Sequence, residues 1–208
     1  MKLSECSVLG RPREFDIEAA LAAALKVFWR KGYDGASLSD LTEAMGVTRP
    51  SLYCAFGNKE ALFRKALELY EREKLAYIDR VLEAPTAYEA VERLLFSAID
   101  TYTNAETPGC MGVNSILSCS AAGAAADSVR LELDRLRSTI ATKLQDRLVR
   151  AKAEGDLPAH CDPAGLTFYF LTLSQGMAIQ ASTGAGRAAL RDMVATALQA
   201  WPRREVAA

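Results

Sequence analysis

The residues with the clearest chemical potential lie between Ala44 and Lys59, where hydroxyl and cationic side chains occur without a carboxylate. Four of its polar side chains, Thr48, Arg49, Ser51 and Tyr53, are close together in the sequence. Arginine can read guanine edges in the major groove, and hydroxyl groups can contact base edges or phosphates. Arg49 and Lys59 are its charged residues. The stretch therefore predicts a surface that faces double-stranded DNA.

Two short helices joined by a tight turn would present these side chains. Ser37 can cap the first helix, and Asp40 can reach back toward that cap. Gly46 suits the left-handed backbone just past a helix end, and a second helix can start from Thr48. Fewer than about 12 residues form a marginal helix in isolation, so packing of Leu52 must hold the second helix in place. The pattern predicts a helix-turn-helix, and the alternative is an ordinary helical hairpin with a polar exposed face.

The predicted DNA contacts come from a basic N-terminal arm, from the cap of the first helix, and from the second helix with the start of the next. They are Arg11, Arg13, Ser37, Thr48, Arg49, Pro50, Ser51, Tyr53 and Lys59. Pro50 is expected to make an apolar or backbone contact. Lys59 follows a helix cap at Asn58, where free backbone N–H groups favour a phosphate. The arm could reach the minor groove, as homeodomain arms do, or be a solvated tail.

The remainder of the chain has helical periodicity and no convincing alternating strand pattern. The expected helices span about 16–31, 58–82, 86–102, 110–120, 128–154, 163–182 and 188–201. The fold class predicted is all-α, with an N-terminal three-helix DNA-binding domain over residues 1–57. Residues 58–208 would form a larger helical bundle that binds an effector and dimerises. The helix over 58–82 would link the two mechanically.

A homodimer is expected, because one short helix reads only a few base pairs and two related by symmetry can read two half-sites. The helix over 163–182 is apolar almost all round, and with the last helix it offers the best pair for a subunit interface. The residues predicted at that interface are Leu173, Met177, Val194 and Leu198. The alternative is that both helices complete the monomer core.

A small-molecule effector is expected between helices of the larger domain, which is a usual place for a ligand in a helical bundle. The residues proposed to line that pocket are Tyr70, Phe96, Tyr102, Cys110 and Phe170. Aromatic side chains at helical spacing are also ordinary core residues, so the pocket is a hypothesis about only some of them.

The chain has five cysteines, an odd number without a Cys-x-x-Cys pair, which favours reduced thiols. Cys110 follows Pro108 and Gly109 and should open a helix, where free N–H groups favour the reactive thiolate. Redox or electrophile sensing at Cys110 is therefore an alternative trigger. The competing interpretation is that Cys110 and Cys119 only fill apolar space.

Several classes of function are disfavoured. His160 is the single histidine, which leaves nothing for a zinc finger or a histidine-based triad. Glycine-rich phosphate loops, nucleophile elbows and paired metal ligands are absent, so we expect no enzyme, cofactor or metal. The alternative kept open is a helical-bundle enzyme or small-molecule carrier that does not bind DNA.

Net charge and hydropathy limit the cellular locations and the binding partners that the sequence allows. The net charge is −1, although residues 1–66 carry ten Lys and Arg against eight Asp and Glu, a weak local excess of +2. No apolar run approaches the roughly 18 to 20 residues that span a membrane, and no secretory signal is recognisable. We expect a cytoplasmic protein without a membrane partner.

The order SLSDLTEAMGVTRPSLYCAFGNKEALF, preceded by ALKVFWRKGYDGAS, resembles the DNA-binding domain of the tetracycline-repressor (TetR) family. The resemblance covers about the first 70 residues strongly and the rest in layout. Cys54 departs from the pattern, since the family often has His or another polar residue there. The resemblance implies a repressor released from a pseudo-palindromic operator by a small effector. It also implies that the last two helices form a four-helix interface with a partner subunit.

Overall fold

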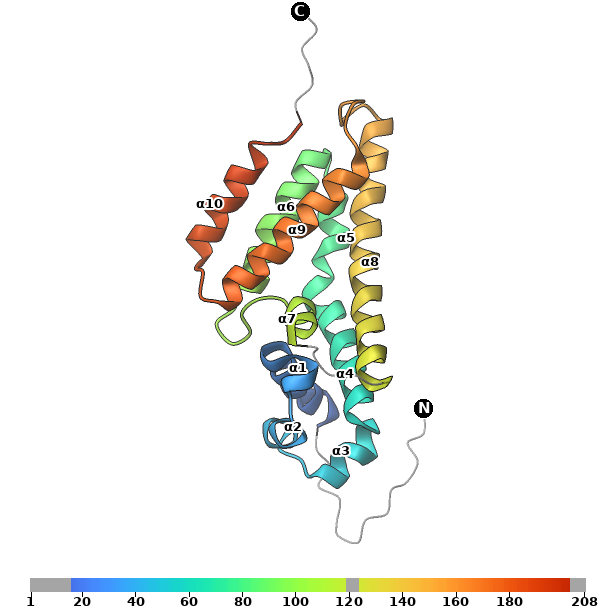
Figure 1. Cartoon of the computed structure of the whole chain (residues 1–208), viewed down its shortest axis with the longest axis vertical. Coiled ribbons are helices and arrows are strands. Elements are labelled where there is room, and N and C mark those ends of the chain that lie inside the picture. The colour runs from blue at the N-terminus through green and yellow to red at the C-terminus, as the bar shows by residue number, and fades with distance from the viewer. Residues whose placement is uncertain (1–15, 119–123, 203–208) are drawn as a thin grey trace, which may run out of the picture.

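The computed structural model describes residues 16–118 and 124–202, and within those ranges every regular element is a helix. The elements are α1 (Ile17–Gly35), α2 (Leu38–Met45), α3 (Arg49–Phe56), α4 (Lys59–Tyr70), the π-helical η1 (Glu71–Leu75), α5 (Tyr77–Leu82), α6 (Ala87–Tyr102), α7 (Met111–Ser118), α8 (Ala124–Ala153), α9 (Pro163–Ser182) and α10 (Arg187–Leu198). The molecule is elongated, with α1 to α3 at one end and α6, α9 and α10 toward the other (Figure 1). The predicted all-α fold is confirmed.

The helix caps predicted around the turn are present. Ser37 Oγ accepts a hydrogen bond from the Asp40 N–H at 3.0 Å, and the Asp40 carboxylate accepts one from the Ser37 N–H at 3.0 Å. Gly46 ends α2 with a φ of 66°, which few residues other than glycine adopt. Thr48 caps α3, and Asn58 caps α4 through a 2.7 Å bond from the Ala61 N–H. These local bonds orient the short helix α3.

The helix expected over 16–31 is interrupted directly after its predicted end. The break lies at Gly32, and a short helical segment follows it as far as Gly35. At Gly32 the backbone has φ 65° and ψ −176°, a region essentially restricted to glycine. A Cβ at Gly32 would lie 1.6 Å from Ser118 Oγ, so α7 packs directly on this bend. The missing side chain is therefore what lets α7 approach α1.

The linker between the two ends of the molecule is not one regular helix. A single helix was predicted from Asn58 to about Leu82, whereas the structure has a π turn, Glu71–Leu75, between α4 and α5. A π turn inserts an extra residue into the helical repeat and so changes which side chains share a face. Two smaller differences are that α7 begins at Met111 and that α8 begins at Ala124 instead of Ser128.

The apolar core has two connected parts. The first joins α1 to α4, and it includes Tyr33, whose ring lies 5.3 Å from that of Phe63. This part also takes in Met111 of α7 and Leu133 and Leu136 of α8. The second part joins α5, α6, α8, α9 and α10. Helix α4 packs in the same cluster as α1 to α3. The domain boundary predicted after residue 57 stays a prediction.

Polar contacts fasten α1 to the segment that leads into α7. The Trp29 indole N–H donates to the Gly109 carbonyl at 3.2 Å, and the Asn114 amide donates to the Trp29 carbonyl at 3.0 Å. The Arg30 guanidinium donates to the Glu106 carbonyl at 2.6 Å. The joint therefore combines close packing with directed hydrogen bonds.

A buried arginine fastens α8 to the loop that follows α5. The Arg147 side chain is 4% exposed and donates to the carbonyls of Leu82 and Ala84, at 3.0 Å each. Its position fixes where the linker ends and α6 begins. Across the described ranges, no helix has the length and apolar character needed to cross a lipid bilayer.

Candidate DNA-reading surface and effector cavity

Helix α3 presents a polar face and buries an apolar one, as its sequence predicted. Leu52 is fully buried and Phe56 is 4% exposed, whereas Tyr53 is 44% exposed. Thr48 Oγ1 accepts from the Ser51 N–H at 3.3 Å and lies 2.9 Å from Ser51 Oγ. The hydroxyl groups at the start of α3 are thus held together at the surface.

Arg49 and Ser37 differ in how free they are to contact another molecule. The exposed Arg49 donates from Nη2 to Ser39 Oγ on α2 at 2.9 Å, which leaves its other N–H groups available for a base edge. Ser37 is exposed too, but its hydroxyl donates to Asp40 at 2.8 Å and accepts from the Asp40 N–H. Ser37 is therefore foremost a helix cap. The exposed Pro50 follows Arg49 in the first turn of α3.

Lys59 lies at the N-terminus of α4, as predicted, and its ammonium stands 4.5 Å from the centre of the Tyr33 ring. Burial lowers the pKa of Lys59, and the negative charge of Asp34 opposes that change. The charge is therefore held near the start of α4 by an aromatic face. Arg11 and Arg13, the two predicted arm contacts, lie outside the described residues.

A cavity of about 100 Å³ lies where the linker, α6, α7, α8 and α9 meet. Three of the five predicted pocket residues, Tyr70, Tyr102 and Cys110, line it. The remaining lining residues are Leu75, Tyr77, Ile78, Leu94, Gly112, Val113, Ile116, Leu133, Leu136, Arg137, Ile140, Leu171, Ser174 and Gln175. The cavity is thus apolar with a few polar groups, which is the usual composition of a small-molecule site.

Two hydrogen-bonded pairs are built into the wall of this cavity. The Tyr70 hydroxyl lies 3.2 Å from Cys110 Sγ, and the Tyr102 hydroxyl lies 2.9 Å from Ser174 Oγ. Burial raises the pKa of both tyrosines, and nearby Cys110 raises each further. Both phenols therefore stay protonated at neutral pH, and each can donate a hydrogen bond.

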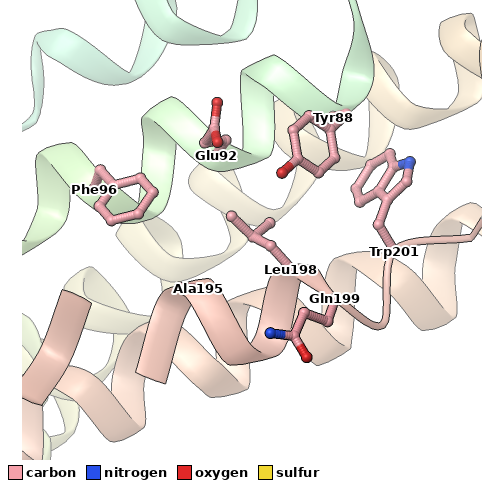
Figure 2. A pocket seen from close by; sticks show the side chains of 7 residues that line it. All are labelled: Tyr88, Glu92, Phe96, Ala195, Leu198, Gln199 and Trp201. Carbon is pink, nitrogen blue, oxygen red and sulfur yellow. The ribbon is translucent and has the colours of Figure 1, made fainter. Parts of the chain in front are cut away.

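The other two predicted pocket residues lie elsewhere. Phe96 lines a surface groove of about 440 Å³ between α6 and α10, together with Tyr88 and Trp201 (Figure 2). Phe96 precedes Tyr102 by six residues, and about 100° per residue places the two on different faces of α6. Phe170 is buried, with its ring 5.7 Å from that of Trp201. The groove is larger than the cavity, and it lies on the other side of α6 from Tyr102.

The structure places most of the predicted interface residues inside the subunit, and the interface itself stays a prediction. Met177 and Val194 have no exposed surface and Leu198 is 7% exposed, so these three pack inside the subunit. Leu173 is half-buried. The side chains that α9 exposes instead include Phe168 at 77%. The apolar pattern predicted a buried helix, whereas α9 buries only one side in the subunit and exposes Phe168, Tyr169 and Ile179.

Comparisons with known proteins add to this geometry. Residues 20–66 match the model of the bacterial regulatory proteins of the tetR family. Over 196 residues, covering 93% of this chain and 92% of the relative, the chain is 35% identical to the HTH-type transcriptional repressor ComR of Escherichia coli strain K12. The chain belongs to the TetR family. It is therefore a DNA-binding transcriptional regulator and not an enzyme, and the predicted alternative of an enzyme or carrier that ignores DNA is set aside.

A second TetR-family relative, the repressor BdcR of E. coli K12, is 36% identical over 111 residues, or 52% of this chain and 56% of BdcR. A solved structure of the TetR-family regulator CifR, a cysteine mutant complexed with 26-base-pair double-strand operator DNA, has a TM-score of 0.85. It is 40% identical to this chain and covers 93% of it and 100% of the CifR chain. The TetR-family interpretation thus extends over both ends of the molecule.

Sequence reasoning missed several residues of the cavity wall. Tyr77 follows Tyr70 by seven residues, close to two helical turns, and that spacing was a usable signal. Arg137 and Gln175 carried no such signal, because each is one polar residue among many on α8 and α9.

Proposed function

We propose that this protein is a ligand-responsive repressor that binds a pseudo-palindromic operator as a homodimer and leaves it when a small effector fills the cavity. It would act in the cytoplasm. The observation that carries the proposal is that one residue of the cavity wall also packs directly against α1, a helix of the DNA-reading end. Tyr70 lines the cavity, and its ring meets the Trp29 ring of α1 at 4.8 Å and 90°. ComR and BdcR are named as repressors, which favours repression here as well.

The path from cavity to DNA would run through α7. Cys110, Gly112 and Val113 line the cavity, and the Asn114 amide donates to the Trp29 carbonyl at 3.0 Å. An effector that displaces α7 must therefore disturb α1, which packs on α2 and α4 through the shared core. The helix α3 of each subunit would then shift relative to the DNA, because its orientation depends on that packing.

The proposed DNA contacts are the polar residues of the reading surface. They are Arg11, Arg13, Ser37, Thr48, Arg49, Pro50, Ser51, Tyr53 and Lys59. If Arg49 reads a base edge, Arg49→Ala should lose about 1 to 3 kcal/mol of operator binding and relax sequence preference. Lys59→Ala should weaken all duplexes alike and flatten the salt dependence.

The test is a gel-shift series at several salt concentrations with the DNA that flanks the coding sequence and with random duplexes of equal length. The parent should prefer one flanking pseudo-palindrome. Arg72→Ala serves as a control, since Arg72 is an exposed arginine of the π turn, away from α3. Equal operator affinity of Arg49→Ala, Lys59→Ala and the parent would refute the assignment.

The dimer is proposed to form through α9 and α10, as the family resemblance implies. Phe168, Tyr169 and Ile179 are large apolar side chains of α9 that stay exposed in the single subunit. Phe168→Ser should therefore weaken dimerisation and operator binding together. Leu131→Ser on α8 is the matched control, because Leu131 is 72% exposed but lies on another helix. Sedimentation that shows a monomer at micromolar concentration with unchanged operator binding would contradict the proposal.

Modification of Cys110 is a second possible trigger. Its sulfur lies 3.2 Å from the Tyr70 hydroxyl in the cavity wall, directly before the first turn of α7. An adduct or an oxidised sulfur would break that contact and need extra volume beside α7. Mild peroxide or quinone should then abolish operator binding in the parent but not in Cys110→Ser.

The exposed Cys54 on α3 supplies the necessary control for this experiment. A thiol on the reading helix could disturb DNA binding directly when modified. Cys54→Ser should therefore keep the response if Cys110 is the sensor. A response that is identical in Cys110→Ser and the parent would remove Cys110 from the mechanism.

A further inference from the structure

The cavity has an uneven distribution of charge. Among its lining residues Arg137 is the one that carries a formal charge, and no Asp or Glu lines the space. Arg137 donates from Nη2 to Asp134 at 3.0 Å, and both side chains are more than half exposed, so this pair adds little. The guanidinium retains its other N–H donors for a ligand.

Two further polar groups of the cavity wall lack a partner. The Tyr77 hydroxyl and the Gln175 amide make no hydrogen bond within the described part of the chain, unlike the paired hydroxyls of Tyr70 and Tyr102. Burial raises the pKa of Tyr77, so its hydroxyl keeps its proton and can donate. Arg137, Tyr77 and Gln175 can thus each donate a hydrogen bond to a ligand, and a ligand with oxygen acceptors would satisfy these donors.

Two of the free polar groups, Arg137 and Gln175, lie on the side of the cavity that faces a groove. A groove of about 410 Å³ runs between α8 and α9, and Arg137, Leu171 and Gln175 line both the groove and the cavity. The largely apolar cavity therefore meets the groove at these three side chains. A ligand there would have its apolar part inside and its polar part beside the guanidinium.

The volume limits the size of the apolar part. A dry protein cavity of about 150 Å³ holds benzene, which has six carbons. In proportion, the cavity of about 100 Å³ accepts roughly four carbons without rearrangement. Longer chains would have to extend into the groove or move the helices apart.

We propose that the effector site accepts a small organic carboxylate, with its short apolar chain in the cavity and its carboxylate between Arg137 and Gln175. The inference rests on the proposed function of the cavity as the effector site. A guanidinium matches the planar carboxylate with two parallel hydrogen bonds, which gives it a stronger interaction than with an alcohol. An organic cation would meet Arg137 with no compensating carboxylate in the wall.

The test compares three probes with one chain and different head groups: sodium pentanoate, pentan-1-ol and pentylamine. Dissociation constants from NMR titration of the full-length protein should rank pentanoate tightest and pentylamine weakest. Arg137→Gln should weaken pentanoate by about tenfold or more and leave pentan-1-ol unchanged. Arg137→Lys keeps the charge but not the planar pair of donors, so its affinity for pentanoate should fall between those of Arg137→Gln and the parent. Arg150→Gln is the matched control, an exposed arginine of α8 that does not line the cavity.

Cavity occupancy and DNA release are measured separately. Val113→Trp should fill the cavity and abolish binding of both pentanoate and pentan-1-ol. Equal affinity of the parent for pentanoate and pentan-1-ol, or unchanged pentanoate binding in Arg137→Gln, would overturn the carboxylate assignment. Pentanoate binding that obeys the predicted variant series but does not change operator affinity in a gel shift would support the site and refute its proposed regulatory role.

Discussion

The bend at Gly32 provides a sharp test of how the two ends of the molecule are joined. The substitution Gly32→Ala adds a single methyl group at a position with φ 65° and ψ −176°. Holding a residue other than glycine in that region costs about 1 to 3 kcal/mol. The added Cβ would also lie 1.6 Å from Ser118 Oγ and 2.8 Å from Ser118 Cβ, which forces α7 away. Overpacking of this kind costs about 1 to 3 kcal/mol more.

The total loss expected for Gly32→Ala is therefore about 2 to 6 kcal/mol, a large part of the about 5 to 15 kcal/mol that stabilises a typical domain. Urea unfolding of the parent and the variant measures it. The second variant Gly32→Ala/Ser118→Gly removes the side chain that the new methyl group meets, so it should recover the steric part alone. Ser118→Gly by itself completes the double-mutant cycle.

Gly35→Ala is the control, because Gly35 lies in the same helix without a left-handed φ, and an added Cβ would meet only Lys31 Cβ at 3.6 Å. Its stability should stay within about 0.5 kcal/mol of the parent. If Gly32→Ala behaves like Gly35→Ala, or if Ser118→Gly recovers nothing, the close approach of α1 and α7 is not what requires glycine at position 32.

Two further predictions concern single polar groups. A hydrogen bond from Lys31 and bonds from Ser37 lower the pKa of Asp40 from 3.8 to about 2, so its carboxylate stabilises the fold above about pH 4 and ceases to as the pH falls toward 2. Asp40→Asn should therefore unfold at lower urea than the parent at pH 7, with a difference that shrinks between pH 4 and 2. Arg147→Met should cost about 3 kcal/mol or more in urea unfolding, because it leaves the buried carbonyls of Leu82 and Ala84 without donors. Arg150→Met, on the exposed face of α8, should change little.

The reading surface could be predicted from sequence because its geometry is set over short distances along the chain. The caps at Ser37, Thr48 and Asn58 each use a backbone N–H three residues onward. Such bonds depend on the local order of residues, and periodicity then separates the buried Leu52 from the exposed Tyr53. The DNA-contact assignments themselves stay predictions.

The cavity could be predicted only in part because it depends on how distant helices pack. Tyr70 and Tyr102 line the cavity, but the helical pattern alone did not distinguish their faces from that of Phe96, which turns toward α10. The π turn over Glu71–Leu75 was also missed, since its residues are compatible with an ordinary helix. Met177 illustrates the same limit, as an apolar helix side chain can face its own core or another subunit.

The shared apolar cluster of α1 to α4, α7 and α8 has a consequence for engineering chimeric regulators. A reading head transplanted from a relative would bring its own α1 to α4 but would have to fit Met111, Leu133 and Leu136 of the recipient. A poor fit between the transplanted helices and these three residues would leave voids or clashes in the apolar cluster. A successful graft would therefore have to carry the facing residues of α7 and α8 along with the reading helices, and a cut placed after residue 57 would divide a single packed unit.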